Sequence, residues 1–259
     1  MQVATWNVNS VRARQERLLH WLRKNPVDVL CLQETKVIDN DFPYEEIQSA
    51  GYEALVHGQK TYNGVAILTR LPAKDLQKGF VDESADDLQA RLIVATIHNI
   101  RMVCVYVPNG KELSSESFQY KLNWLKRLKT YLTRQVDASP QLPFLICGDF
   151  NVAPTDQDVF KPDDWKDSVL CHESIRDALR DLTNIGLIDI FRRLNPEVQA
   201  FSWWDYRMLA FPKNNGLRID LILTNELLAK TCSEVKIDRD ERKGEKPSDH
   251  VPVILTIES

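Results

Sequence analysis

Hydrophobic residues in this chain occur in short runs, separated by longer segments in which apolar residues recur at helical spacing. The runs are rich in Val, Ile, Leu and Cys and are bounded by turn residues, which predicts β-strands. We expect strands at residues 3–7, 29–34, 52–56, 64–69, 90–97, 100–107, 144–151 and 220–223, and a last one that ends at Glu258.

Three amphipathic helices are predicted between these strands. Ser10 is expected to cap a helix from Val11 to Lys24, which Pro26 prevents from continuing. A longer helix is expected at about 115–136, and a third at about 173–183. The polar face of the longer helix is expected to be ordinary solvated surface, and its basic residues are Lys121, Lys126, Arg127, Lys129 and Arg134.

The order of strands and helices is similar in the two halves of the chain. This order predicts an α/β fold with two sheets packed face to face and helices outside each, a four-layer sandwich. Because the chain has no long polar linker, we expect residues 1–259 to form a single domain.

Polar residues flank five of the hydrophobic runs. In three runs the polar group closes the strand, and in the other two it opens the strand. Strands of opposite direction in one sheet would bring all of these groups to the same rim. The residues are Asn7, Glu34, Asp149, Asn151, Asp220, Asp249 and His250.

Two kinds of chemistry are available at such a rim. The candidate metal ligands carry only oxygen donors, which favours Mg²⁺ or Mn²⁺ over zinc and suggests a phosphate ester as the substrate. They are Asn7, Glu34, Asp149, Asn151 and Asp249. In addition, the Asp220 carboxylate could orient the His250 ring for acid or base catalysis. Taken singly, each residue is more often a turn cap or a structural residue, so the hypothesis depends on their joint occurrence.

Composition is that of an ordinary soluble globular protein, with 43% hydrophobic and 27% charged residues. Five cysteines, an odd number within apolar runs, indicate reduced thiols. The first strand begins too early for a signal peptide, and the chain has no run of membrane-spanning length, so we expect a cytoplasmic protein with no membrane partner. The net charge of −4 argues against a surface that is basic throughout.

Six motifs, in order and spacing from residue 2 to about 256, resemble those of the exonuclease III family of abasic-site endonucleases. They are Trp6-Asn7-Val8-Asn9, Leu32-Gln33-Glu34-Thr35-Lys36, Val105-Tyr106-Val107-Pro108-Asn109-Gly110, Gly148-Asp149-Phe150-Asn151, Gly216-Leu217-Arg218-Ile219-Asp220 and Ser248-Asp249-His250.

The resemblance implies a DNase I-like fold and hydrolysis of the DNA phosphodiester 5′ to an abasic site, which leaves a 3′-hydroxyl. It implies Mg²⁺ as the cofactor, with Mn²⁺ as a substitute. Family members variously add 3′-to-5′ exonuclease and 3′-phosphatase or phosphodiesterase activity. The expected partner is double-stranded DNA with abasic sites or blocked 3′ ends, bound by a monomer in the cytoplasm, at the nucleoid when on DNA.

The residues that bind the metal and the phosphate in the family have matching positions in this sequence. Glu34 would anchor the metal, and Asn7 would orient Asp149. Asn151 would hydrogen-bond a non-bridging phosphate oxygen, and Tyr106 would place its hydroxyl on the phosphate or the leaving group.

The resemblance implies that Asp149 and His250 transfer protons. His250, held by Asp220, would contact the phosphate and share in activating water, while Asp249 would join or position the metal cluster. Whether Asp149 or His250 is the principal base stays open.

Substrate residues follow from the same resemblance. Trp203 matches an aromatic position in the family's sugar pocket, with Leu217 and Ile219 as its apolar walls. Such a pocket would admit a deoxyribose without its base and reject an intact nucleotide. Arg207 stands where family members insert a side chain into DNA, and Asn109 where some bacterial relatives carry Gln, so both are expected to contact DNA. Together with Lys213 and Arg218, Arg207 gives the segment a positive charge suited to phosphates.

Two other functions are compatible with parts of the sequence. A lipid or inositol phosphatase of the same superfamily would need apolar loops or a targeting segment for the membrane, and the sequence has neither. A DNA-binding member without catalysis would tolerate the loss of a metal ligand, whereas every expected position is filled.

Overall fold

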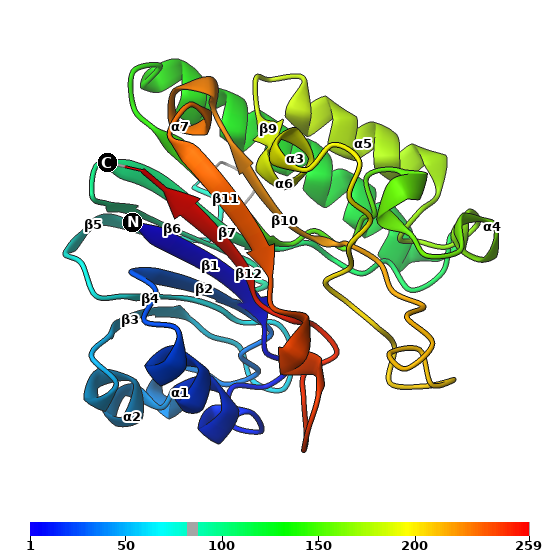
Figure 1. Cartoon of the computed structure of the whole chain (residues 1–259). Coiled ribbons are helices and arrows are strands. Elements are labelled where there is room, and N and C mark those ends of the chain that lie inside the picture. Colours follow the sequence, from blue (N-terminus) through cyan, green and yellow to red (C-terminus); the bar gives the residue numbers. More distant parts are fainter. Residues whose placement is uncertain (82–87, 259) are drawn as a thin grey trace.

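Two β-sheets lie face to face and helices cover their outer faces, as the sequence predicts (Figure 1). The computed structural model describes residues 1–81 and 88–258. Within these ranges, twelve strands form two six-stranded sheets, each with parallel and antiparallel pairs. The four-layer α/β sandwich is therefore confirmed.

The first sheet contains most of the N-terminal strands and the two last strands of the chain. Its strands, in spatial order, are β11 (Cys232–Ile237), β12 (Val253–Ile257), β1 (Gln2–Asn7), β2 (Val29–Gln33), β4 (Val65–Thr69) and β3 (Glu53–His57). Helices α1 (Gln15–Lys24) and α2 (Tyr44–Ser49) cover its outer face (Figure 1).

The second sheet is built from the middle of the chain. Its strands, in spatial order, are β5 (Ala73–Lys78), β6 (Leu92–Ile97), β7 (Ile100–Tyr106), β8 (Phe144–Asp149), β10 (Asp220–Thr224) and β9 (Ile188–Asp189). Helices α3 (Glu116–Ala138) and α5 (Glu173–Thr183) cover its outer face (Figure 1).

Shorter helices lie in the connections. They are α4 (Pro162–Trp165), α6 (Ile190–Leu194), α7 (Glu226–Ala229) and 3-10 turns at Asp39–Asp41, Asp156–Asp158 and Arg239–Arg242. Throughout residues 1–81 and 88–258, we find no helix with the length and apolar character that crossing a bilayer requires.

Three hydrophobic layers hold the sandwich together. Small side chains such as Cys31, Cys104 and Cys147 fill the space between the sheets, while larger ones such as Trp21 and Phe118 pack under the outer helices. All five cysteines are buried and unpaired, which agrees with the prediction of reduced thiols.

The first helix begins later than predicted. Ser10 has a left-handed backbone with φ of 89°, and α1 starts at Gln15 rather than Val11. The amides of Ser10 and Val11 donate to the carbonyls of Glu34 and Thr35, so the chain remains tied to the end of β2 before it turns into the helix. In contrast, α3 begins close to its predicted start, where Ser115 caps it with a hydroxyl that accepts from the Phe118 amide.

Strand direction brings the candidate residues to one rim of the sandwich. β1 runs parallel to β2, and β12 runs antiparallel to β1, so the end of β1 and the start of β12 meet. In the second sheet, Asp149 at the end of β8 pairs in register with Asp220 at the start of β10. The shared rim is confirmed, but the expectation that a single sheet supplies it is wrong, because the groups divide between two facing sheets.

Arg218 is buried beneath this rim, with 1% of its surface exposed. Its Nε lies 2.7 Å from Asp158 Oδ1, and its Nη2 lies 2.7 Å from Asp189 Oδ2. Arg192 also pairs with Asp158 at 2.7 Å. The expectation that Arg218 belongs to a positive loop for phosphates is therefore wrong: its charge is neutralised inside the protein, where it fixes the segment that leads into β10.

Substitution Asp158→Asn should destabilise the fold, because it leaves a buried guanidinium with one carboxylate fewer. We expect a loss of about 3 kcal/mol in the free energy of unfolding at pH 7, measured by urea denaturation. Asp156→Asn, in the same turn but exposed, is the matched control and should change stability by less than about 0.5 kcal/mol.

The destabilisation should also depend on pH. Burial alone would raise the pKa of Asp158. Arg218 and Arg192 lower the pKa by more than burial raises it, so the pKa in the folded protein is below its usual value. A depressed folded-state pKa stabilises the fold above the unfolded pKa of about 4, and the effect is lost as the pH falls through the folded pKa. The gap between wild type and Asp158→Asn should therefore narrow below about pH 4; an equal gap at pH 3 and pH 7 would contradict the pairing.

Candidate active site

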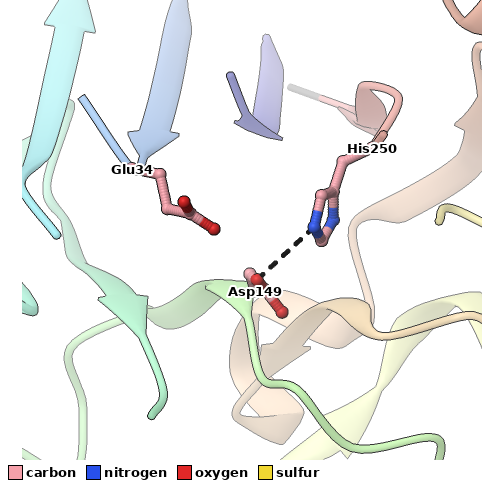
Figure 2. A group of neighbouring side chains, drawn as sticks. All are labelled: Glu34, Asp149 and His250. Atoms are coloured by element: carbon pink, nitrogen blue, oxygen red, sulfur yellow. Dashed lines mark ion pairs between the residues drawn. The ribbon is translucent and has the colours of Figure 1, made fainter. Parts of the chain in front are cut away.

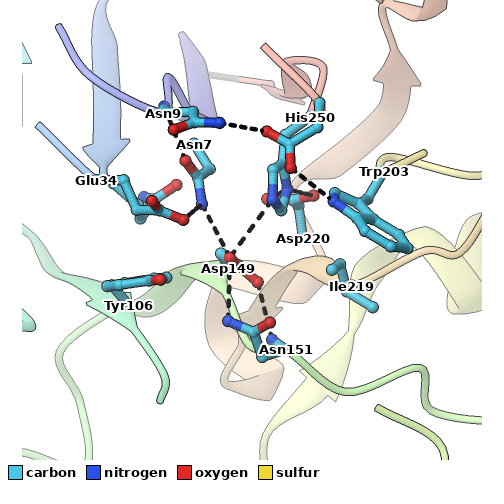
Figure 3. A network of polar contacts seen from close by, with 12 residues as sticks. Asn7, Asn9, Glu34, Tyr106, Asp149, Asn151, Trp203, Ile219, Asp220 and His250 are labelled. Carbon is cyan, nitrogen blue, oxygen red and sulfur yellow. Dashed lines mark hydrogen bonds and ion pairs between the residues drawn. The ribbon is translucent and has the colours of Figure 1, made fainter. Parts of the chain in front are cut away.

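Four strand ends deliver the polar residues to the rim between the sheets. Asn7 ends β1 and Glu34 follows β2 in the first sheet, while Asp149 ends β8 in the second. His250 precedes β12 and points back toward Asp149 (Figure 3). Residues 243 positions apart in the sequence, Asn7 and His250, thus lie in one polar cluster.

Local backbone geometry places Asp149 and Asn151. Gly148 approaches β7 so closely that a Cβ atom would lie 1.9 Å from the Val105 carbonyl oxygen, and its φ is 149°. Only glycine fits there. Asn151 has φ of 51°, and its amide donates to Asp149 Oδ1 at 2.8 Å. This turn directs the Asp149 side chain toward Asn7 of the opposite sheet and holds Asn151 beside it.

Asn7 connects the two sheets through its side-chain amide. Its Nδ2 donates to Glu34 Oε1 at 2.8 Å and to Asp149 Oδ2 at 3.0 Å. Its Oδ1 accepts from the Asn9 amide. This geometry supports the predicted role of Asn7 in orienting Asp149.

His250 and Asp220 form the predicted pair. His250 Nδ1 lies 2.9 Å from Asp220 Oδ2, and the other ring nitrogen, Nε2, lies 3.7 Å from Asp149 Oδ2 (Figure 2). Both His250 and Asp220 are almost fully buried. The ring is therefore held with one nitrogen on Asp220 and the other facing the centre of the site.

The environment brings the pKa of Asp149 close to neutrality. Burial raises the pKa of Asp149 to about 7, and the charges of Asp220 and Glu34 add to this effect while His250 opposes it. Burial lowers the pKa of His250, but Asp220 and Asp149 outweigh it and raise the pKa to about 10. A carboxyl group with a pKa near neutrality is suited to proton transfer.

Glu34, Asp149 and His250 form a candidate metal centre. One ligand atom from each residue lies within 4.8 Å of the others (Figure 2). Two carboxylates that face a common space suit a hard divalent cation such as Mg²⁺, which takes one or two carboxylates and keeps several waters. Lys36 Nζ lies 2.8 Å from Glu34 Oε2, so a cation already accompanies this carboxylate.

Asn151 and Tyr106 complete the face of the second sheet. Asn151 Nδ2 donates to Asp149 Oδ2 and to the Val107 carbonyl, and its Oδ1 accepts from Asn109. Tyr106 pairs in register with Asp149 at the end of β7. Burial and the charges of Glu34 and Asp149 raise the pKa of Tyr106 well above its usual value, so its hydroxyl remains protonated.

Asp249 lies apart from the candidate metal centre. Its Oδ2 accepts from the Trp203 indole at 3.0 Å, and its Oδ1 accepts from Asn9 Nδ2 at 3.0 Å. Among the residues that the structure describes, the carboxylate and imidazole group around Asp149 does not include it. Its role as a metal ligand stays a prediction.

Some of the predicted substrate residues line a groove, and the others are buried behind it. Asn109, Trp203 and Arg207 line one groove together with Trp165. Leu217 and Ile219 are buried, with 0% and 1% exposure, and belong to the core cluster against which Trp203 packs. The side chain of Arg207 is 84% exposed and pairs with Asp205.

Lys121 is the functional candidate that the sequence prediction missed. It was expected on the solvated face of its helix, but it is 0% exposed. Its Nζ donates to the carbonyls of Asn109, Asn151 and Val169 at 3.1, 2.7 and 2.7 Å. It therefore ties two loops of the groove to the turn at residues 148–151, which carries the candidate catalytic residue Asp149 and is called the catalytic turn below.

A signal for this burial was present in the sequence. Lys121 follows Phe118 by three residues and precedes Leu125 by four, so helical spacing places it on the apolar stripe. Burial lowers the pKa of Lys121 to about 7, with Asp149 opposing the effect.

Comparisons with known proteins agree with this geometry. The sequence profile of the endonuclease/exonuclease/phosphatase family matches residues 4–250. The chain belongs to this family. It is 39% identical to exodeoxyribonuclease III of Haemophilus influenzae over 267 aligned residues, which cover 98% of each chain.

Solved structures of family members superpose closely on the chain. An AP endonuclease from Archaeoglobus fulgidus gives a TM-score of 0.95 at 38% identity, with all of both chains covered. A 3′ phosphatase from Neisseria bound to a product DNA hairpin gives 0.96 at 36% identity, again with all of both chains covered.

Substitution Lys121→Met should loosen the catalytic turn, because three buried carbonyls lose their donor. We expect a lower melting temperature and at least a tenfold lower turnover number on a phosphodiester substrate, since misplaced catalytic groups lose about one to two orders of magnitude in rate. Lys126→Met, on the exposed face of α3, is the matched control. A fully active Lys121→Met enzyme would contradict the positioning role.

Proposed function

We propose that the protein is a Mg²⁺-dependent DNA repair nuclease that hydrolyses the phosphodiester 5′ to an abasic site in duplex DNA. The products are a 3′-hydroxyl and a 5′-deoxyribose phosphate. The same centre would remove nucleotides, phosphates or sugar fragments from 3′ ends, because these reactions also break a phosphate ester. We further propose that it acts as a monomer in the cytoplasm and meets its substrate at the nucleoid.

One observation carries the proposal: Asn7 and His250 from one sheet converge on Asp149 from the other. The distances are 3.0 Å from Asn7 Nδ2 and 3.7 Å from His250 Nε2 to the same oxygen, Asp149 Oδ2. Asp220 orients the imidazole from behind. An oriented imidazole beside a buried carboxylate is an arrangement for acid and base catalysis.

Glu34 would hold Mg²⁺ in this centre, with Asp149 close enough to share it. When bound, the cation would offset the charge that develops on the phosphate oxygens and on the leaving 3′ oxygen. Asn7 would keep the two carboxylates apart and oriented, since its amide donates to both.

Other side chains would bind the phosphate and transfer protons. His250 would donate a hydrogen bond to a non-bridging phosphate oxygen, and Asn151 would do the same by exchanging one of its two bonds, to Asp149 or to the Val107 carbonyl, for one to the phosphate. The neutral Tyr106 hydroxyl would donate to the phosphate or leaving group. Asp149, whose pKa lies near neutrality, would take a proton from the attacking water or supply one to the leaving oxygen.

Relatives support the choice of DNA as the substrate. The Archaeoglobus protein is described as an AP endonuclease and the Neisseria protein as a 3′ phosphatase bound to DNA, and both share the whole fold of this chain. The groove around Trp203 lies beside His250, where a sugar lacking its base would be held as its 5′ phosphate meets Asp149. Asn109 and Arg207 on the same groove would contact the DNA backbone.

A duplex oligonucleotide with one tetrahydrofuran abasic analogue tests the proposal. Incision 5′ to the analogue should require Mg²⁺ and stop with EDTA. Asp149→Asn should lower the rate about a thousandfold, because it removes the group assigned to proton transfer. Asp137→Asn, an exposed carboxylate at the end of α3, should retain full activity. No incision by wild-type protein with Mg²⁺ would refute the proposed function.

A further inference from the structure

Trp203 forms one wall of the groove, and its indole has a single hydrogen-bond donor. The Trp203 backbone exchanges two hydrogen bonds of 3.0 Å with Leu217, which fixes the Cα position. The ring itself lies near two others: the Trp165 ring, whose centroid is 5.8 Å away, and the His250 ring, whose centroid is 6.4 Å away. Such ring contacts restrict the position of the indole, and the hydrogen bond of its N–H then fixes the tilt of the ring.

Asp249 supplies the acceptor for that N–H. Trp203 Nε1 lies 3.0 Å from Asp249 Oδ2, and Asn9 Nδ2 lies 3.0 Å from Asp249 Oδ1. The Asp249 carbonyl accepts from the Trp204 amide at 3.0 Å. The carboxylate is therefore held on both oxygens and at its own backbone.

The acceptor of the indole N–H is a carboxylate oxygen rather than the oxygen of a neutral side chain. A hydrogen bond to a charged acceptor is roughly twice as strong as one between neutral groups. Asp249 can thus hold a bulky aromatic ring that is only partly buried.

The same carboxylate is connected to the candidate metal centre by a short chain of contacts. Lys36 Nζ bonds Asn9 Oδ1 at 2.5 Å and Glu34 Oε2 at 2.8 Å. Asn9 in turn donates to Asp249. The wall of the groove and the carboxylate proposed to hold Mg²⁺ are therefore positioned by one continuous set of polar side chains.

We propose that Asp249 is a positioning residue for substrate choice: it holds the Trp203 indole in the orientation that accepts an abasic sugar and excludes a nucleotide. This inference rests on the proposed function. It assigns Asp249 to the groove through Trp203, whereas a metal ligand would act through the cation. A rigid wall discriminates by shape better than a mobile one, because no free energy is spent on ordering it when substrate binds.

A double-mutant cycle tests the proposal. Trp203→Phe retains an aromatic wall but removes the donor, and Asp249→Ala removes the acceptor. For each protein, kcat/KM is measured with Mg²⁺ on the tetrahydrofuran duplex and on the matched undamaged duplex, and the ratio is the abasic preference. Each single variant should lower the preference about tenfold, the effect of losing one hydrogen bond to a charged group. The double variant should lower it no further.

Two control variants separate positioning from general damage. Trp204→Phe removes the same donor from a core indole whose Nε1 has no hydrogen-bond partner among the described residues, so its preference should be unchanged. Asp249→Asn keeps an acceptor oxygen for the indole and should retain part of the preference.

Three results would overturn the proposal. The first is a double variant whose loss of abasic preference equals the product of the two single losses, and the second is an unchanged preference in Trp203→Phe. The third is an Asp249→Ala protein that keeps the preference but needs a different Mg²⁺ concentration for half-maximal activity. Failure of wild-type protein to incise the tetrahydrofuran duplex would instead refute the proposed function. The two failures are therefore distinguishable.

Discussion

Buried charge at the junction of the two sheets is the constraint on which the site depends. Asp149 and Asp220 belong to one sheet, and their partners Asn7 and His250 belong to the other. An unpaired buried carboxylate costs several kcal/mol, so the hydrogen bonds that cross the junction fix the distance between the sheets at the rim. The geometry required for catalysis is thus also a requirement for folding.

Two buried basic side chains extend this control to the surrounding loops. Lys121 gathers three carbonyls behind the catalytic turn, and Arg218 joins Asp158 to Asp189 behind the strand that begins at Asp220. Both side chains are almost fully buried, at 0% and 1% exposure. They therefore hold the segments next to the rim in place from inside the protein.

Most of the fold and the catalytic cluster could be predicted from sequence because the signals are local. Strands such as β1, β2 and β8 are buried hydrophobic runs, and a polar residue at the end of such a run marks the rim of a sheet. Strand β5 was not predicted, because it is an edge strand whose residues are mostly exposed and polar. The late start of α1 was also missed, since it depends on backbone bonds from Ser10 and Val11 to the end of β2.

The features that could not be predicted from sequence depend on contacts between residues far apart in the chain. Lys121 and Arg218 are of residue types that usually lie at the surface, and their burial depends on partners 12 to 60 positions away, such as Asn151 and Asp158. Asp249 is predicted to join or position the metal cluster because it is a carboxylate in a motif, and that role stays a prediction; its contacts in the structure go to Trp203 and Asn9. Residue type was sufficient to predict the kind of chemistry, while the contacts assign individual roles.

The fate of the water oxygen tests most directly whether this centre performs hydrolysis. Incision of abasic duplex DNA in ¹⁸O-enriched water, followed by mass spectrometry of the fragments under single-turnover conditions, locates the new bond. Attack of water on phosphorus places one heavy oxygen in the 5′-phosphate of the abasic fragment and leaves an unlabelled 3′-hydroxyl. An unlabelled phosphate, with an unsaturated sugar at the new 3′ end, would show strand cleavage by elimination and contradict the account.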